Sequence, residues 1–350
     1  MRVLIVRIGA MGDVLHAMPA VAALRAMRPD CFIGWAIEPR WSDLLQMAGD
    51  MDDLSQGVGP TAARALVDRW YSVPTGAWKR RPLAGETLSE VDVLRQVLKG
   101  ERFDVTVDMQ GAVKSAVVGR MAGAPVFVGA EEPRERMARW MYKVKVPVAA
   151  AHVVVQGCEL LGAAVGETLR PAKVTLPMDA EDELWADGLV GRQKKMCLIS
   201  PTAGWGAKEW PAERFGKVAA ELGSAGISVL VNASVSGTGE ADKIVETSGG
   251  AAQAVPCSIG QLTALTRRAA VVIAGDTGPL HLAAALERPV VGIYGPTSPA
   301  RNGPFGTRAK VVRDAESVTS HKRVSEVEAG LMRVSVEDVV GAAWELLRER

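Results

Sequence analysis

The sequence predicts an α/β fold made of two consecutive domains. Short, almost continuously apolar segments alternate with amphipathic helical segments over the 350 residues, and this alternation is typical of parallel sheets covered by helices. The chain is also longer than one hydrophobic core usually supports. Several of the apolar segments end in glycine-bearing turns. In open α/β sheets, ligands bind at such turns, beyond the carboxyl ends of the strands.

The composition excludes several classes of protein. Hydrophobic residues make up 48% of the chain and charged residues 23%, which is a globular composition. The formal net charge is +1, so no overall field draws the protein to nucleic acid. No signal peptide or membrane-spanning apolar run is visible in the sequence. Four scattered cysteines without a CxxC pair indicate reduced thiols in the cytoplasm, and four scattered histidines show no metal-ligand spacing.

The first half opens on residues 3–8 (VLIVRI), a strand apolar enough for the centre of a parallel sheet. A turn at 9–13 follows, and then a helix that ends before Pro29. Asp13 comes at the carboxyl end of this strand. Two interpretations of Asp13 compete, a helix N-cap or a carboxylate that faces a ligand cleft. Dinucleotide binding would require the full GxGxxG motif, which is absent here.

Further strands are predicted at 32–37, 103–108 and 126–129, with helices around 40–47 and 152–161. The Gly- and Pro-containing connector 162–177 indicates the domain boundary. We therefore expect domains at 1–170 and 171–334. A closing amphipathic helix within 335–350 is expected to pack back on the first domain.

Cations in the first half gather in loops and near helix starts. Lys79, Arg80 and Arg81 follow a tryptophan in a loop flanked by Pro and Gly. Such loops are usually just solvated, but this one suits an anionic acceptor. Lys114 follows the Asp-Met-Gln-Gly turn at 108–111, and Arg134 lies in a charged segment whose default interpretation is exposed surface.

One DxD pattern, at Asp50–Asp52, has the spacing of a metal–nucleotide site. It lies in a polar connector rather than at a strand end. Solvated loop charge is therefore the favoured interpretation.

In the second half, strand 196–200 runs into a glycine-rich loop that carries Lys208 before a helix beginning at Pro211. The loop is not a Walker A motif. Lys208 either neutralises a diphosphate or is an ordinary exposed lysine. After strand 227–232, Glu240 opens a helix, where it either accepts hydrogen bonds from ribose hydroxyls or complements the helix dipole.

The stretch 271–296 predicts strand, turn, helix and strand in succession. Its turn contains Asp276, Thr277 and Gly278. Glycine allows the backbone to approach a ligand, and the free N–H groups of the next helix suit a phosphate. Asp276 and Thr277 are candidate caps of that helix, and His281 is expected to point toward the same space. The alternative is that these residues only cap the helix and that His281 is a partly buried surface histidine.

Five motifs occur in a characteristic order: RIGAMGDVLH at 7–16, DMQGAVKS at 108–115, GWGAKEWP at 204–211, DTG with His281, and YGPT at 294–297. Together they resemble lipopolysaccharide heptosyltransferases of glycosyltransferase family 9, most closely heptosyltransferase I. The resemblance implies the GT-B architecture, in which two Rossmann-like domains face each other across a cleft.

The resemblance also implies the reaction. A heptose would pass from ADP-L-glycero-D-manno-heptose, held by the C-terminal domain, to the 3-deoxy-D-manno-octulosonic acid (Kdo) of lipid A–Kdo, held by the N-terminal domain. Asp13 corresponds to the general base. The residues expected to contact the donor are Lys208, Glu240, Asp276, Thr277, Gly278 and His281. The residues expected to contact the acceptor are Gly12, Lys79, Arg80, Arg81, Lys114 and Arg134.

A single candidate carboxylate with no second nucleophile fits direct displacement with inversion. A lysine and a helix N-terminus would stabilise the leaving ADP, so we expect neither a metal nor another cofactor. The expected partners are the nucleotide sugar and the acceptor, with no nucleic acid. We also expect a cytoplasmic monomer that makes transient peripheral contact with the inner membrane.

The alternatives are heptosyltransferase II, a transferase for a different nucleotide sugar, and a non-catalytic nucleotide-sugar-binding protein. The last of these would not require Asp13. A nicotinamide oxidoreductase would need an intact GxGxxG and an acidic residue about 20 positions later, and neither is present.

Overall fold

The computed structural model describes residues 1–45, 65–191, 195–202, 204–233, 239–320 and 324–348. Two compact units, Met1–Pro177 and Met178–Arg350, divide at the end of the connector predicted from the sequence. Each unit contains a six-stranded sheet in which every pairing is parallel. The predicted α/β fold with two domains is therefore confirmed. The Asp50–Asp52 pattern lies outside the described residues.

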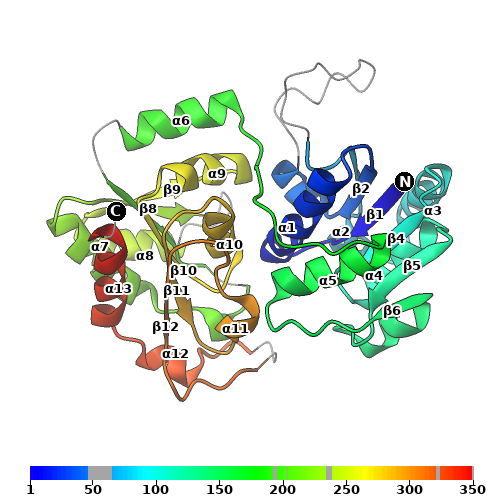
Figure 1. Ribbon diagram of the computed structural model, residues 1–350. Coiled ribbons are helices and arrows are strands. Elements are labelled where there is room, and N and C mark those ends of the chain that lie inside the picture. The colour runs from blue at the N-terminus through cyan, green and yellow to red at the C-terminus, as the bar shows by residue number, and fades with distance from the viewer. Residues whose placement is uncertain (46–64, 192–194, 203, 234–238, 321–323, 349–350) are drawn as a thin grey trace. The chain divides into compact units, whose positions relative to one another are not determined.

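The first unit alternates strands and helices (Figure 1). Its elements are β1 (Arg2–Val6), α1 (Met11–Met27), β2 (Phe32–Ile37), the 3-10 helix η1 (Pro39–Leu44), β3 (Arg69–Ser72), α2 (Thr75–Arg80), α3 (Gly85–Gly100), β4 (Val105–Asp108), α4 (Val113–Met121), β5 (Val126–Ala130), the 3-10 helix η2 (Arg136–Met141), β6 (Val144–Val146) and α5 (Val153–Val165). The helix predicted around 40–47 is thus a 3-10 turn in its described part.

The strand order of the first sheet is β3-β2-β1-β4-β5-β6. Successive strands from β1 to β3 are added toward one edge of the sheet, and successive strands from β4 to β6 are added toward the other edge. The neighbours β1 and β4 pair in register, with Val6 opposite Asp108. Ligands of such sheets bind where the direction reverses, because the connections on the two sides diverge there and leave a crevice. The turns that follow β1 and β4 therefore flank the expected ligand position of this unit.

Helices cover both faces of the first sheet. Leu94 of α3 and Val118 of α4 belong to the core cluster that contains Leu4 and Val6 of β1. On the other face α1 packs against α5. Because helix layers bury both sides of β1, its sequence is continuously apolar rather than alternating.

The second unit repeats the same plan. Its elements are α6 (Ala180–Val190), β7 (Met196–Ser200), the 3-10 helix η3 (Gly206–Lys208), α7 (Ala212–Ser224), β8 (Ser228–Ala233), α8 (Gly239–Thr247), β9 (Ala252–Pro256), α9 (Ile259–Arg268), β10 (Val271–Gly275), α10 (Gly278–Ala285), β11 (Val290–Tyr294), α11 (Pro299–Asn302), β12 (Ala309–Arg313), α12 (Ala329–Arg333) and α13 (Val336–Arg348). The order β12-β11-β10-β7-β8-β9 places β7 and β10 at the centre. The direction reverses between them.

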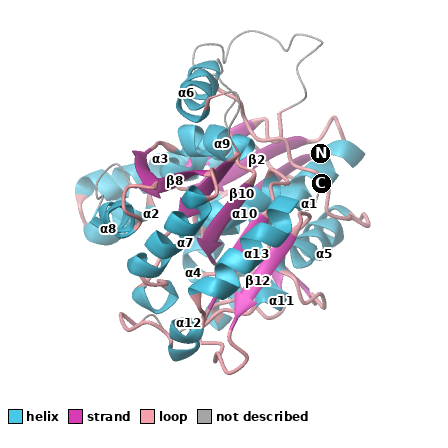
Figure 2. Cartoon of the chain, turned by 90° about the vertical axis from the view of Figure 1, so that its left-hand side faces the viewer, coloured by secondary structure: helices cyan, strands magenta, loops and turns pink. Residues whose placement is uncertain are grey.

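The closing helix α13 corrects one sequence-based expectation. The helix within 335–350 was predicted to pack back on the first domain. Instead, Val339, Ala343 and Leu346 belong to the core cluster of the second unit, together with Phe215 and Leu222 of α7. Figure 2 shows α7 and α13 over one face of the second sheet. The expectation was wrong because an apolar stripe specifies that a helix must be covered but not which sheet covers it.

Within the described residues, no helix combines the length and the apolar character needed to span a lipid bilayer.

Candidate active site

Asp13 lies in the first turn of α1, beside the end of β1. Its N-cap is Ala10 rather than Asp13. The Asp13 carboxylate reaches back to this start, since Oδ2 accepts a hydrogen bond from the Ala10 N–H at 3.2 Å. Its Oδ1 lies 2.8 Å from Nη2 of Arg7, and the side chain remains 32% exposed. The carboxylate thus stabilises the helix start and also presents an accessible oxygen face.

Arg7 connects the two central turns of the first unit. Besides its ion pair with Asp13, its Nε donates to the Asp13 carbonyl oxygen at 3.0 Å, and its Nη1 donates to the carbonyl oxygen of Met109. One planar guanidinium therefore orients Asp13 against the turn that follows β4. Arg7 was not among the site residues predicted from the sequence. The available signal was a cation inside an otherwise apolar strand segment.

Asp108 organises the turn after β4 from within. Its Oδ1 accepts from the backbone N–H groups of Gln110 and Gly111 at 2.9 and 3.0 Å, and its Oδ2 accepts from the hydroxyls of Ser115 and Tyr142 at 2.9 and 2.8 Å. Burial raises the pKa of Asp108 despite these four donors. The side chain is 1% exposed, so it braces the turn and is not an accessible base.

Hydrogen bonds connect the turn after β4 to the end of β1 and to the Arg134 segment. Gln110 Oε1 accepts from the Ile8 N–H at 2.8 Å. Gly111 has a φ of +67°, and a Cβ there would lie 3.0 Å from the Arg134 backbone nitrogen, so this position favours glycine on two counts. The Glu135 N–H donates to the Gly111 carbonyl at 2.8 Å. Arg134 therefore lies at the same sheet edge as Asp13.

The remaining predicted acceptor residues lie on α1, α2 and α4. Gly12 directly precedes Asp13 in the first turn of α1. Lys114, in the first turn of α4, is exposed, and its Nζ lies 3.4 Å from the hydroxyl of Thr75 at the start of α2. Three further cations are exposed at the end of α2 and just beyond it, and they form no ion pairs with other described residues: Lys79, Arg80 and Arg81. The structure thus gathers α2, Lys114 and the Arg134 segment around the ends of the first sheet's strands.

In the second unit, Lys208, Asp276 and His281 form one compact cluster. Lys208 Nζ lies 2.7 Å from Asp276 Oδ2, and His281 Nε2 lies 3.0 Å from Asp276 Oδ1. All three side chains are largely buried. The Lys208 ammonium also lies 4.6 Å from the centre of the Trp205 ring, a cation–π contact. Lys208 is therefore not an ordinary exposed lysine but is held by two partners.

The electrostatics of the cluster keep Asp276 ionised. Burial by itself would raise its pKa, but the hydrogen bond and charge of His281 and the ammonium of Lys208 outweigh burial and hold the pKa well below its usual range. Asp276 is consequently an anion that fixes Lys208 between β7 and β10.

The predicted capping of α10 by side chains is wrong. Thr277 is its N-cap, but the Thr277 hydroxyl donates to the Gly275 carbonyl at 3.3 Å, and no side chain caps the helix. Asp276 is engaged with Lys208 and His281. The first-turn N–H groups of Gly278 and Leu280 therefore keep the orientation that suits an anion.

The ionised Asp276 carboxylate should contribute to the stability of the folded state at neutral pH. Because its folded pKa lies below the ordinary 3.8, this contribution is fully present above that value and is lost as the pH falls through the folded pKa. Urea unfolding below roughly pH 5 should show a steeper loss of unfolding free energy for the wild type than for Asp276→Asn. Asp242→Asn, which changes an exposed carboxylate of α8, should follow the wild-type curve. Parallel curves for the wild type and Asp276→Asn would contradict the assignment.

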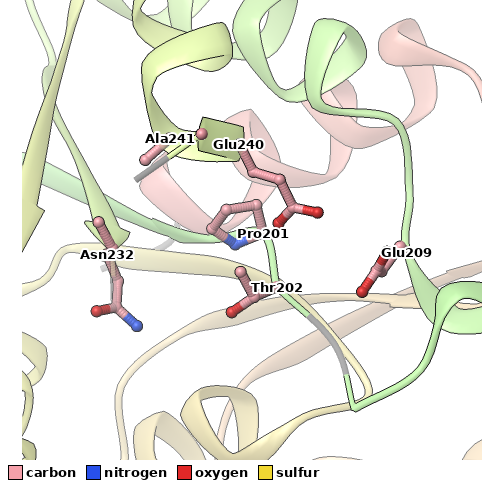
Figure 3. A pocket seen from close by; sticks show the side chains of 8 residues that line it. Pro201, Thr202, Glu209, Asn232, Glu240 and Ala241 are labelled. Atoms are coloured by element: carbon pink, nitrogen blue, oxygen red, sulfur yellow. The ribbon is translucent and has the colours of Figure 1, made fainter. Parts of the chain in front are cut away.

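Beside this cluster, a pocket of about 380 Å³ opens at the ends of β7 and β8. Its lining residues are Pro201, Thr202, Glu209, Asn232, Ala233, Gly239, Glu240 and Ala241. Figure 3 shows Glu240 above Thr202 and Glu209 to the right of it, with Asn232 on the left. Burial, followed by the charge of Glu209, raises the pKa of Glu240. Thr202, which lines the pocket, and Lys208 of the cluster both belong to the chain segment between β7 and α7.

A family model for glycosyltransferase family 9 (heptosyltransferase) matches residues 91–331. The chain belongs to this family. It is therefore a glycosyltransferase, as the motifs predicted.

Two curated relatives span most of its length. Lipopolysaccharide heptosyltransferase 1 of Escherichia coli (strain K12) is 27% identical over 327 residues, covering 89% of this chain and 93% of the relative. Lipopolysaccharide heptosyltransferase 1 of Pseudomonas aeruginosa is 27% identical over 310 residues, covering 87% and 82%. The predicted resemblance to heptosyltransferase I is confirmed.

Solved structures agree with the fold of this family 9 glycosyltransferase. The E. coli heptosyltransferase WaaC with ADP superposes with a TM-score of 0.78 at 24% identity, covering 99% of this chain and 100% of the other. A family 9 glycosyltransferase of Veillonella parvula gives a TM-score of 0.81 at 20% identity, covering 100% and 98%. At these identities the likeness concerns the fold alone.

Several residues that the geometry brings to the two sites were not selected from the sequence: Arg7, Thr202, Trp205, Glu209 and Asn232. Arg7 and Asn232 take their places through contacts with residues distant along the chain, Met109 and Ser200, whereas Trp205 contacts the nearby Lys208. Among the described residues, no group of three or more His, Cys, Asp or Glu side chains is placed to hold a metal ion.

Proposed function

We propose that this family 9 glycosyltransferase transfers heptose from ADP-L-glycero-D-manno-heptose to the Kdo of the lipopolysaccharide inner core. The observation that carries the proposal is that each unit has its own chemistry at its central turn, and that the two kinds of chemistry are complementary. The first unit presents the accessible carboxylate of Asp13 at its sheet centre. The second unit presents Lys208 and the start of α10 at the centre of its own sheet. The names of the relatives, lipopolysaccharide heptosyltransferase 1, support this choice of reaction.

In the proposed step, an Asp13 carboxylate oxygen takes the proton of the acceptor hydroxyl. The hydroxyl oxygen then bonds to the anomeric carbon as the bond from that carbon to the diphosphate oxygen breaks, and ADP leaves from the opposite face with inversion. Arg7 and the Ala10 N–H hold the Asp13 carboxylate in one orientation. A fixed base within hydrogen-bond reach is the geometric requirement for this role.

The second unit would bind the donor. Lys208 and the N–H groups of Thr277 and Gly278 would stabilise the diphosphate as its charge grows. Asp276 and His281 would hold Lys208 in place, and Glu240 would accept hydrogen bonds from the ribose hydroxyls in the pocket. A WaaC structure bound to ADP-2-deoxy-2-fluoro heptose is among the similar folds, which supports a nucleotide-sugar site in this architecture.

The exposed cations of the first unit would bind the acceptor. Kdo carries a carboxylate, and lipid A carries phosphates, so their partners should be cations near Asp13. We further propose that the enzyme acts without a metal, as a monomer in the cytoplasm, in transient contact with the inner membrane that holds the acceptor. Nucleic acid is not a proposed partner.

The decisive experiment measures ADP release from ADP-heptose in the presence of an acceptor that ends in Kdo. Release that depends on this acceptor supports the proposal. Release only with an acceptor that already carries the first heptose would indicate heptosyltransferase II. Release from a different nucleotide sugar would indicate a different donor, and donor binding without release would indicate a non-catalytic binding protein.

Removing the acceptor cations should raise KM for the acceptor. Lys114→Gln and Arg134→Gln should each weaken acceptor binding by several-fold, because a charge-assisted contact is worth roughly 1.5–3 kcal/mol before screening. The difference from the wild type should shrink with added salt. Titrating acceptor and ADP separately checks the division of roles, with Lys217→Gln on α7 as the control. Weaker ADP binding with unchanged acceptor KM would reverse the roles of the units.

A further inference from the structure

The 3-10 helix η2 exposes two large apolar side chains. Trp140 is 84% exposed and Met137 is 70% exposed. Such side chains are costly to hold in water, and clustered exposed apolar groups mark interaction sites. Neither residue belongs to the candidate active site.

The geometry of a 3-10 helix sorts η2 into three faces. With three residues per turn, side chains at i and i+3 lie one above the other. Met137 and Trp140 therefore share an apolar face, and Arg136 and Arg139 share a cationic face. The third face carries Ala138, which is fully buried.

The inner face of η2 packs against the core of the unit. Ala138 packs with Ala116 of α4, Phe127 of β5 and the adjoining Tyr142. Arg120 of α4 also donates to the Met141 carbonyl at 3.2 Å. The outward display of Met137 and Trp140 is thus fixed by the core and does not arise from a loose loop. We refer to residues 136, 137, 139 and 140 as the η2 knob.

We propose that the η2 knob docks on a bilayer with anionic headgroups. Its composition combines an aromatic and a flexible apolar side chain with adjacent arginines, which suits the interfacial layer of such a membrane. Arg136 forms no ion pair with another described residue and is exposed, whereas Arg139 pairs with Glu131 at 3.0 Å. A second copy of the chain fits poorly, because a twofold contact through the knob would bring its arginines against one another.

The position of the knob agrees with this partner. It begins directly after Glu135, whose N–H bonds to Gly111 and whose Oε2 accepts from the Val113 N–H at 2.8 Å. The knob is therefore continuous with the sheet edge proposed to bind the acceptor. The inference deepens the proposed function, since a lipid-borne acceptor would be drawn from the same bilayer that the knob contacts.

The test is flotation of the full chain with vesicles of phosphatidylethanolamine and phosphatidylglycerol, compared with vesicles of phosphatidylcholine alone. The wild type should bind the anionic vesicles preferentially. The double variant Met137→Ala/Trp140→Ala should bind them about tenfold less or weaker still, because most of the inserted apolar area is gone. Arg136→Gln should lower binding about fivefold and reduce its salt dependence, given the worth of one cation near such a surface.

Matched controls lie in the second unit. Leu184→Ala changes a 72% exposed apolar side chain of α6, and Lys217→Gln changes an exposed cation of α7. Both should bind vesicles like the wild type. Turnover of the double variant on a deacylated, Kdo-terminated acceptor should also equal that of the wild type, which separates docking from catalysis.

Two results would overturn the inference: unchanged flotation of the double variant, or a wild-type dimer that the double variant dissociates. Absent turnover on every acceptor would instead contradict the proposed function and leave the flotation comparison valid. Equal thermal unfolding of wild type and double variant establishes that the fold is intact.

Discussion

Asp13→Asn should lower kcat by roughly 10²–10⁴-fold, the usual range for loss of a general base, while ADP binding stays within a few-fold of wild type. Asparagine keeps the size of the side chain and an oxygen that can accept from the Ala10 N–H. It cannot take up the acceptor proton. The loss should therefore fall on the chemical step and not on donor binding, which the second unit would provide.

Steady-state kinetics measure kcat, and ADP titration measures ADP binding separately. Asp92→Asn is the matched control, because it removes an exposed carboxylate of α3 in the same unit. Its kcat should equal that of the wild type. Turnover of Asp13→Asn within a few-fold of the wild type would remove Asp13 from the proposed mechanism and require another base.

Lys208→Ala should slow turnover by roughly 10²–10³-fold, the range for loss of one preorganised donor to developing charge. It should also weaken ADP binding, since the contact with the diphosphate would exist in the ground state and strengthen as ADP leaves. The loss has a second component. Without the ammonium 2.7 Å away, the Asp276 carboxylate would repel the diphosphate.

The double variant Lys208→Ala/Asp276→Asn tests that second component. Removing the uncompensated carboxylate should restore part of the ADP affinity lost in Lys208→Ala, while turnover stays low. Equal ADP affinity of the single and double variants would show that repulsion by Asp276 contributes nothing. Lys217→Ala on α7 should leave both quantities unchanged.

Lys208→Ala also tests the proposed independence from metals. Wild-type turnover should persist in excess EDTA, and added Mg²⁺ should not rescue Lys208→Ala. Loss of activity in EDTA with recovery on adding Mg²⁺ or Mn²⁺ would contradict the lysine-and-helix account. The Asp50–Asp52 segment would then be the first place to look for ligands.

The local pattern of apolar residues in the sequence was enough to predict the strands that are buried on both faces. The strands at 32–37 and 196–200 have the predicted bounds, because residues covered by helices on both sides must be apolar throughout. The helix predicted to begin at Pro211 forms as α7, and it buries Phe215 and Leu222. Elements with a weaker pattern, such as β3, were missed: its only buried residue is Tyr71.

The motif order in the sequence was enough to identify the family, and the residues at the strand ends could be named as candidates. Their partners could not be named. Arg7 reaches the carbonyl of Met109 across 102 positions, and Lys208 reaches Asp276 across 68. Helical periodicity likewise required α13 to be covered but did not indicate by which sheet.

Only the tertiary structure decided these pairings, because they depend on strand order. The reversal of direction between β1 and β4, and again between β7 and β10, makes neighbours of turns that are far apart in the chain. Side-chain atoms approach to within hydrogen-bond distance only once both strands are seated in their sheet. A local pattern of apolar and polar residues carries no information about which strands will be neighbours.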